Sequence, residues 1–319
     1  FKDNWPKRSY ISKYLRIMYL TLSKEDIDVS DLNELDHVES EDSIYVISND
    51  AYNMANIWGK TVQRPMYKGL ISADDIDALD VLTLMMEQLI GRSKGGNLMY
   101  SVPAVAVDIQ NDITYHSGVF GRIFKELGYN AQPMNEALAI VYSELMDNNF
   151  TGLAISCGAG QQNICLAYKK NPVFSFSVAR SGDYIDESVA RSLGTVPTRV
   201  TSIKEKSLDL MNYRQGNKKE RRVKEALAYY YKDTMRYVLD IVRKKLETEL
   251  GDTELPESLP IVISGGTSMA KGYIELFKEI IEEYEDFPFE IKEIRHAEDP
   301  LTAVSEGLLI KAMSLENKL

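Results

Sequence analysis

The sequence has few cysteines, a deficit of positive charge and no long hydrophobic run. Cys157 and Cys165 are the only cysteines among 319 residues, which argues against a disulfide scaffold and favours a reducing, cytoplasmic location. No signal peptide is recognisable. The apolar stretch from Tyr14 to Leu22 contains Arg16 and is much shorter than the roughly 20 residues that a membrane span needs. A formal net charge of −11 argues against a general nucleic-acid-binding protein and against electrostatic attachment to an anionic membrane.

What is present is the composition of a folded protein of about two domains. Hydrophobic residues make up 44% of the chain, enough for a substantial core. Apolar segments typical of strands alternate with amphipathic segments typical of helices, and this alternation predicts an α/β fold. Residues 195–217 have a mixed, polar sequence, and we expect Pro256 and Pro260 to flank a linker. The predicted strands are residues 44–47, 97–103, 153–155, 164–168, 173–178, 261–263 and 289–291, and the predicted helices are residues 51–55, 73–91, 117–127, 135–146, 183–193, 218–250, 273–284 and 301–313.

The central feature of the chain is the stretch TGLAISCGAGQQN, residues 151–163. Two apolar strands on either side of Gly158-Ala159-Gly160 predict a β-hairpin. Glycines let backbone N–H groups come close to a ligand, and turns of this kind form nests that bind anions, so a phosphate is the obvious candidate. The alternative is a turn without a ligand.

The helix predicted at 218–250 begins with the basic run KKERR. This run favours a solvated surface over a nucleic-acid patch.

Five further motifs, taken together with SCGAGQQN, resemble those of the actin-like ATPases. This superfamily includes the sugar kinases and the seventy-kilodalton heat-shock chaperones, and within it the chain most resembles the MreB-like bacterial and archaeal actin homologues. The likeness extends over about residues 43–313. The five motifs are IYVISNDAYNMANIWGKTVQRPMYKGLIS (44–72), NEALAIVYSEL (135–145), SVARSGDYIDESVARSLG (177–194), SGGTSMAKG (264–272) and AEDPLTAVSEGLL (297–309).

The resemblance implies a two-lobed actin-like ATPase fold, in which duplicated ribonuclease-H-like mixed sheets are flanked by helices. The first lobe would contain residues 1–134 and 300–319, and the second residues 135–299, including a helical subdomain at 195–256. ATP with Mg²⁺ would be bound and hydrolysed in a cleft between the lobes. Members of this branch polymerise, so the resemblance also implies head-to-tail self-association into cytoskeletal filaments.

The resemblance also assigns roles to particular residues. The turn at 158–162 would be the second phosphate loop, and the turn at 265–268 would lie against the adenosine, although alone it could be an ordinary strand-to-helix corner. Glu136 would orient the attacking water as the catalytic residue, or else be an acid favoured by a helix N-terminus. The nucleotide-binding residues implied are Ser156, Gly158, Ala159, Gly160, Gln161, Gln162, Asn163, Gly265, Gly266, Thr267 and Ser268.

Two further pairs have looser assignments. Gly182 and Asp183 would face the ribose or the phosphates, while Asp186 is interpreted as structural. Lys204 and Glu205 fall where the family has side chains that contact the adenosine, although a solvated surface fits this pair as well. No residue of the chain is assigned as a direct protein ligand of the metal.

The sequence departs from the family pattern at three places. Ser156 stands where the second phosphate loop has an Asp that holds hydrated Mg²⁺, and a hydroxyl is a poorer ligand than a carboxylate for such a cation. Asn163 replaces the usual residue at the far end of that loop. The first phosphate loop is not found, and because the chain begins at Phe1 we expect a segment carrying that loop to precede it. These departures keep open a degenerate, non-hydrolysing scaffold, whereas the lack of a suitable Asp disfavours a sugar or acid kinase.

Overall fold

A computed structural model of the chain describes residues 18–315, except 26, 28–31, 33, 56, 73, 111, 252, 285 and 286. The first four residues of the apolar stretch from Tyr14 to Leu22, residues 14–17, lie outside the described residues. No helix in the described part of the chain combines the length and the hydrophobicity that crossing a membrane requires.

The chain divides into two compact units. The first contains residues up to Leu98 together with Thr114–Gln132, and the second contains Met99–Ile113 and the chain from Pro133 onward. The division implied by the resemblance differs at two places, because residues 99–113 and the C-terminal helix belong to the second unit. The C-terminal helix packs there against the helix that begins at Glu136.

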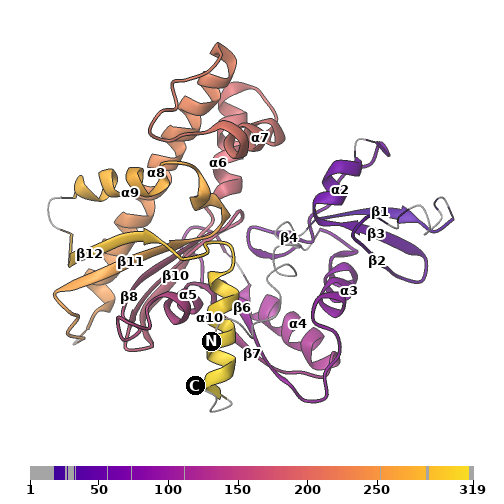
Figure 1. The fold of residues 1–319 in the computed structure, drawn as a ribbon, viewed down its shortest axis with the longest axis horizontal. Coiled ribbons are helices and arrows are strands. Elements are labelled where there is room, and N and C mark those ends of the chain that lie inside the picture. The colour runs from indigo at the N-terminus through magenta and orange to yellow at the C-terminus, as the bar shows by residue number, and fades with distance from the viewer. Residues whose placement is uncertain are drawn as a thin grey trace. The chain divides into compact units, whose positions relative to one another are not determined.

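The first unit is built around a small antiparallel sheet in the strand order β1-β3-β2 (Figure 1). Its elements are β1 (Tyr19–Ser23), β2 (His37–Glu39), β3 (Ser43–Ile47), α2 (Ser48–Ala55), β4 (Met66–Tyr67), β5 (Leu70–Ile71), α3 (Ala78–Ile90) and α4 (Ile113–Glu126). Successive side chains of a strand point to opposite faces. Accordingly, Leu20 and Val46 pack with α2 on one face of the sheet, while Tyr19 and Ile47 pack with α3 on the other.

The second unit contains a five-stranded mixed sheet in the order β10-β9-β8-β11-β12 (Figure 1). Its elements are α5 (Glu136–Glu144), β8 (Gly152–Cys157), β9 (Gln162–Tyr168), β10 (Asn171–Val178), α6 (Gly182–Leu193), α7 (Pro197–Ser207), α8 (Lys218–Glu249), β11 (Ser258–Ser264), the 3-10 helix η3 (Gly266–Met269), α9 (Tyr273–Glu282), β12 (Glu290–His296) and α10 (Ala303–Leu315). Strands β8, β9 and β10 form an antiparallel meander, and β11 runs parallel to both β8 and β12. Two further strands, β6 (Asn97–Val102) and β7 (Asn130–Asn135), pair with each other.

Helices cover both faces of the five-stranded sheet. Leu153 and Ile155 lie in the larger core with α6, α7, α8 and α9, whereas Ala154 between them faces α5 and α10. This second face is lined by small side chains, which let the two helices lie close together. At Gly307 of α10, an added Cβ would lie 1.7 Å from the carbonyl oxygen of Ala139 in α5. The glycine of the closing motif therefore permits this helix contact.

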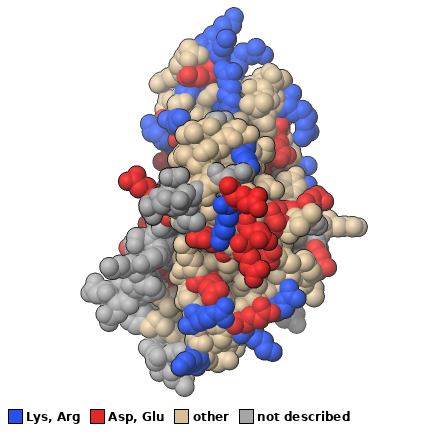
Figure 2. Space-filling model, turned by 90° about the vertical axis from the view of Figure 1, so that its right-hand side faces the viewer, with Lys and Arg blue, Asp and Glu red and all other residues tan. Residues whose placement is uncertain are grey.

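The long helix α8 combines a buried stripe with an exposed basic start. Leu227, Tyr231 and Val238 are almost fully buried, at the helical spacing from which this helix was predicted. Its first basic residues are exposed, as a solvated face requires: Lys218, Lys219, Arg221 and Arg222. Figure 2 shows Lys and Arg gathered at the upper end of the molecule, the end at which α8 begins in Figure 1.

Two predictions about secondary structure were wrong, and one helix was not predicted from the local pattern. The polar stretch 195–217 contains α7, which begins with Pro197 at its first position, where the missing N–H of proline has no helical partner to lose. Its polar sequence hides the helix, because only Val200 is buried and packing against α6 and α8 supplies the stabilisation. Pro260 lies inside β11 instead of flanking a linker, and β12 extends well beyond the predicted 289–291.

Candidate functional site

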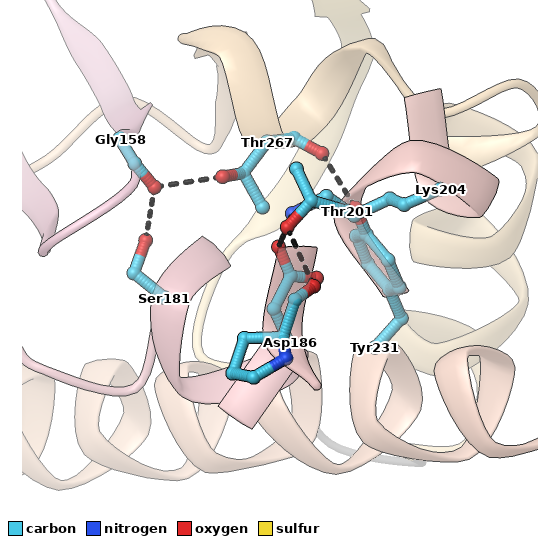
Figure 3. Close-up of polar contacts among 8 residues, drawn as sticks. Gly158, Ser181, Asp186, Thr201, Lys204, Tyr231 and Thr267 are labelled. Carbon is cyan, nitrogen blue, oxygen red and sulfur yellow. Dashed lines mark hydrogen bonds and ion pairs between the residues drawn. The ribbon is translucent and has the colours of Figure 1, made fainter. Parts of the chain in front are cut away.

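The two glycine turns meet at one edge of the second unit. Strands β8 and β11 are parallel neighbours, with Ser156 directly opposite Ser264, so both strands end at the same edge of the sheet. This edge is where open α/β sheets bind their ligands. The turn after β8 and the turn after β11 are joined by a hydrogen bond of 2.7 Å from Thr267 Oγ1 to the carbonyl oxygen of Gly158 (Figure 3).

Two glycines are required here because backbone segments approach each other closely. Gly265 has a φ of +95°, and a Cβ at this position would lie 2.4 Å from the carbonyl oxygen of Cys157. A Cβ on Gly182 would lie 2.5 Å from Thr267 Oγ1 and 3.3 Å from the Cα of Ala159. Any larger residue would therefore push the two turns and the start of α6 apart.

The carbonyl groups of the 158–160 turn point toward α6. The carbonyl oxygen of Gly158 accepts from Ser181 Oγ (Figure 3). It also accepts from the N–H of Gly182, and the carbonyl oxygen of Ala159 accepts from the N–H of Asp183 at 2.8 Å. In a trans peptide the N–H points opposite to the C=O of the same plane. The N–H groups of residues 159 and 160 therefore point away from α6.

The start of α6 is tied to the first glycine turn by backbone hydrogen bonds. The N–H groups of Gly182 and Asp183 donate to the carbonyl groups of Gly158 and Ala159, so this part of the helix holds the turn in place. Ser181, which the sequence analysis did not single out, donates from its side chain to the same carbonyl group of Gly158. Its position directly before Gly182 in the SGD motif is the signal that could have identified it.

The two glutamines of the loop differ in their surroundings. Gln162 is held in place, because its Nε2 donates to the carbonyl oxygen of Arg180 at 2.8 Å and its Oε1 accepts from Cys157 Sγ at 3.4 Å. Gln161 is only 3% exposed, yet neither its Oε1 nor its Nε2 has a hydrogen-bond partner among the described residues. Buried polar side chains are normally satisfied, so Gln161 is the loop residue best suited to a hydrogen bond with a bound ligand or water.

Glu136 lies at the start of α5, where Asn135 caps the helix by accepting from the N–H of Leu138 at 3.0 Å. Its carboxylate accepts two hydrogen bonds: Oε1 from Ser156 Oγ at 2.6 Å and Oε2 from Asn163 Nδ2 at 2.9 Å. Glu136 as a whole is partly exposed, but desolvation of its carboxylate raises its pKa, and the bond from Ser156 opposes that shift. Both departures from the family loop therefore contact the predicted catalytic residue.

Lys204 is engaged by a carboxylate within the protein (Figure 3). Its Nζ lies 2.7 Å from Asp186 Oδ2, which also accepts from Thr201 Oγ1 at 2.6 Å. Burial raises the pKa of Asp186, and the neighbouring ammonium of Lys204 opposes that shift. The pair ties α7 to α6, in agreement with a structural role for Asp186. In contrast to Lys204, Glu205 is exposed.

The end of the second glycine turn is held by the surrounding helices and strands. The carbonyl oxygen of Thr267 accepts from Tyr231 OH at 3.2 Å (Figure 3), and that of Ser268 lies 3.0 Å from His296 Nε2. Gly266 is different, since the nearest atom to an added Cβ would be Leu301 Cδ2 at 4.0 Å. A ligand could therefore approach the backbone at Gly266. Among the described residues, no group of three or more His, Cys, Asp or Glu side chains could hold a metal ion.

Comparison with known proteins identifies a family and a fold. The model of the Volactin family matches residues 6–312. MreB5 of Spiroplasma citri bound to ADP is similar with a TM-score of 0.63 and 15% identity, over 94% of this chain and 90% of that one. The MamK double helical filament has a TM-score of 0.62 and 15% identity, over 86% of each chain. The ethanolamine utilization protein EutJ from Carboxydothermus hydrogenoformans has a TM-score of 0.51 and 17% identity, over 78% of this chain and 79% of that one. MreB5 is also known bound to AMPPNP. No functionally curated protein matches the sequence.

Proposed function

Because the chain belongs to the Volactin family and has an actin-like fold, we propose that it binds ATP, hydrolyses it and assembles head to tail into filaments. The observation that carries this proposal is the meeting of the turns 158–160 and 265–268 at the carboxyl ends of β8 and β11. The nucleotides bound to MreB5 and the filament formed by MamK support it by analogy of fold alone.

In this proposal each turn has a separate task. The outward N–H groups of Ala159 and Gly160 bind the β- and γ-phosphates, since backbone donors on a glycine turn suit anionic oxygens. Gln161 adds a buried amide that has no protein partner among the described residues. The adenosine lies against the turn at Gly266, whose backbone is open to a ligand. Lys204 acts on this site indirectly, because it holds α7 against α6.

The proposed reaction is an attack by water on the γ-phosphate. A water oxygen forms a bond to the γ-phosphorus while the bond between that phosphorus and the bridging oxygen of ADP breaks. The carboxylate of Glu136 accepts the proton that the water loses, and the products are ADP and inorganic phosphate. General-base catalysis of this kind contributes about 10²–10⁴-fold to a rate. Glu136 suits the task because it is partly exposed and held by two donors.

The residues present fit a magnesium ion that is held mainly through the substrate. Mg²⁺ commonly keeps several waters and is bound by one or two carboxylates and the phosphates of a nucleotide. Among the described residues no group of three or more His, Cys, Asp or Glu side chains could hold the ion, so phosphate oxygens and waters would be its ligands. When bound, the ion would neutralise charge on the β- and γ-phosphates.

The second candidate function is a non-hydrolysing actin-like scaffold, and Ser156 is the observation that favours it. A hydroxyl at this position provides no negative charge for a hydrated metal ion. In that case ATP would bind without turnover, or would not bind, and filament assembly would not depend on hydrolysis. The glycine turns would still be required for the packing described above.

The experiment that tests the proposal combines ATP turnover, ATP binding and sedimentation of the purified protein with Mg²⁺. We expect ATP-dependent sedimentation and slow hydrolysis, and we expect Glu136→Gln to bind ATP normally while turnover falls at least about 100-fold. Glu187→Gln on α6 is the matched control, because it also removes one carboxylate of the second unit but is neither the proposed base nor a predicted nucleotide contact. Tight binding without turnover in the wild type would favour the scaffold, and lack of binding would refute the site.

A further inference from the structure

The carboxylate of Glu136 accepts hydrogen bonds from two residues, Ser156 and Asn163, that face each other across the central hairpin. We call this pair of hydrogen bonds the grip. Ser156 of β8 and Asn163 of β9 form a directly opposed pair in the antiparallel ladder, so their side chains lie on the same face of the sheet. Ser156 donates to one carboxylate oxygen and Asn163 to the other. Both residues are at most 2% exposed, so the grip is part of the rigid sheet and not of a surface loop.

The orientation of Asn163 is itself determined by the backbone. Its Oδ1 accepts a hydrogen bond of 2.8 Å from the N–H of Ala104, and an N–H can only donate. The amide nitrogen of Asn163 must therefore point to Glu136, which receives a donor and not an acceptor. Ser177 of β10, opposite Asn163 on its other side, donates to the carbonyl oxygen of Ala104 at 2.9 Å and holds this backbone segment in place.

From this geometry we propose that Ser156 and Asn163 are positioning residues that hold the carboxylate of Glu136 in one orientation for the water that attacks the γ-phosphate. The inference rests on the proposed ATP hydrolysis. It gives Ser156 a task of its own in place of the metal-binding Asp that it replaces. A carboxylate at position 156 would face the carboxylate of Glu136 at the distance of the present hydrogen bond, and two such groups cannot both stay ionised.

The titratable groups on the elements packed around Glu136 include two thiols on the sheet and a carboxyl group on α10. Burial raises the pKa of Cys157 on β8 and of Cys165 on β9 to about 12, so both thiols stay neutral. On α10, Glu306 is buried and accepts from Thr302 Oγ1 at 2.9 Å. Neither thiol therefore adds a charge beside Glu136 near neutral pH.

The test compares Ser156→Ala, Ser156→Thr, Ser156→Asp and Asn163→Leu by kcat, by KM for ATP and by the pH dependence of kcat. We expect Ser156→Ala and Asn163→Leu to lower kcat about 10-fold or more with KM nearly unchanged, and to move the acid limb of the profile to higher pH, because a lost donor raises the pKa of a carboxyl group. Ser156→Thr retains the hydroxyl and should restore most of the rate. Ser156→Asp should lower kcat further, whereas a gain in Mg²⁺-dependent turnover would overturn the inference.

A second measurement separates this inference from the proposed function. The carboxyl carbon of Glu136, assigned by ¹³C NMR with Glu136→Gln as the reference, can be titrated without any nucleotide. The inference predicts a higher pKa in Ser156→Ala than in the wild type, and an unchanged value refutes the grip itself. If the pKa moves as expected but the wild type hydrolyses no ATP, the proposed function and the catalytic purpose of the grip are both refuted.

Discussion

The ion pair between Lys204 and Asp186 makes a quantitative prediction about stability. The two side chains are only 13% and 7% exposed and their charged atoms lie 2.7 Å apart, so solvent screens them little. Removing one partner of such a pair leaves an uncompensated buried charge, which destabilises a protein by about 3–5 kcal/mol. We therefore expect Lys204→Met to lower the free energy of unfolding of the second unit by about that amount, whereas the exposed neighbour Lys206→Met should change it by less than about 0.5 kcal/mol.

The loss of stability in Lys204→Met should also depend on pH, in a direction that follows from the pKa of Asp186. Burial already raises the pKa of Asp186 above its usual 3.8, and loss of Lys204 raises it further. A folded-state pKa above the unfolded value means that the folded variant binds the extra proton. Its deficit relative to the wild type is therefore full at pH values above the raised pKa and shrinks as the pH falls toward 3.8. The replacement of both partners, Asp186→Leu with Lys204→Met, should recover part of the loss.

Urea unfolding followed by far-ultraviolet circular dichroism measures this effect, because most of the long helices lie in the second unit. Trp58 lies in the first unit, so its fluorescence gives an independent signal that should not change. A loss below about 1 kcal/mol that is the same at pH 5 and pH 8 would refute the buried pair. A large rise in the Kd for ATP with unchanged stability would instead restore the predicted contact between Lys204 and adenosine.

Two further changes test other parts of the second unit. Gly265→Ala places a Cβ 2.4 Å from the carbonyl oxygen of Cys157, on a residue whose φ is +95°. We therefore expect a loss of stability of at least about 1–3 kcal/mol and weaker ATP binding. A variant that unfolds in urea and binds ATP like the wild type would contradict the close approach. Asn217 caps α8 through two backbone N–H groups at 3.1 and 3.0 Å, so Asn217→Ala should cost about 1 kcal/mol, while Lys218→Glu should stabilise by about 0.3–1 kcal/mol at low salt, both measured by urea unfolding.

Much of the fold follows from the sequence because its signals are local. A run of β-branched and aromatic residues defines β3, short apolar runs define the strands of the hairpin, and the apolar spacing from Val223 to Leu246 defines α8. The glycine after α6, Gly194, adopts the left-handed conformation that favours glycine at this position. The order of the glycine motifs indicated an actin-like fold, which the similar structures confirm. The local signal failed where packing decides, as at α7, whose polar sequence is held as a helix by its neighbours.

The candidate site depends far more on tertiary structure. The sequence alone places glycines and a glutamate in order, but Glu136 and Ser156 are 20 residues apart, and Gly158 and Thr267 are 109 residues apart. Only the parallel pairing of β8 with β11 and the packing of α5 on the sheet bring them together. The same packing decides that Lys204 meets Asp186 and that Ser156 donates to Glu136. Hydrogen bonds of this kind depend on atoms placed to within a few tenths of an ångström, and that placement comes from the folded core and not from residue order.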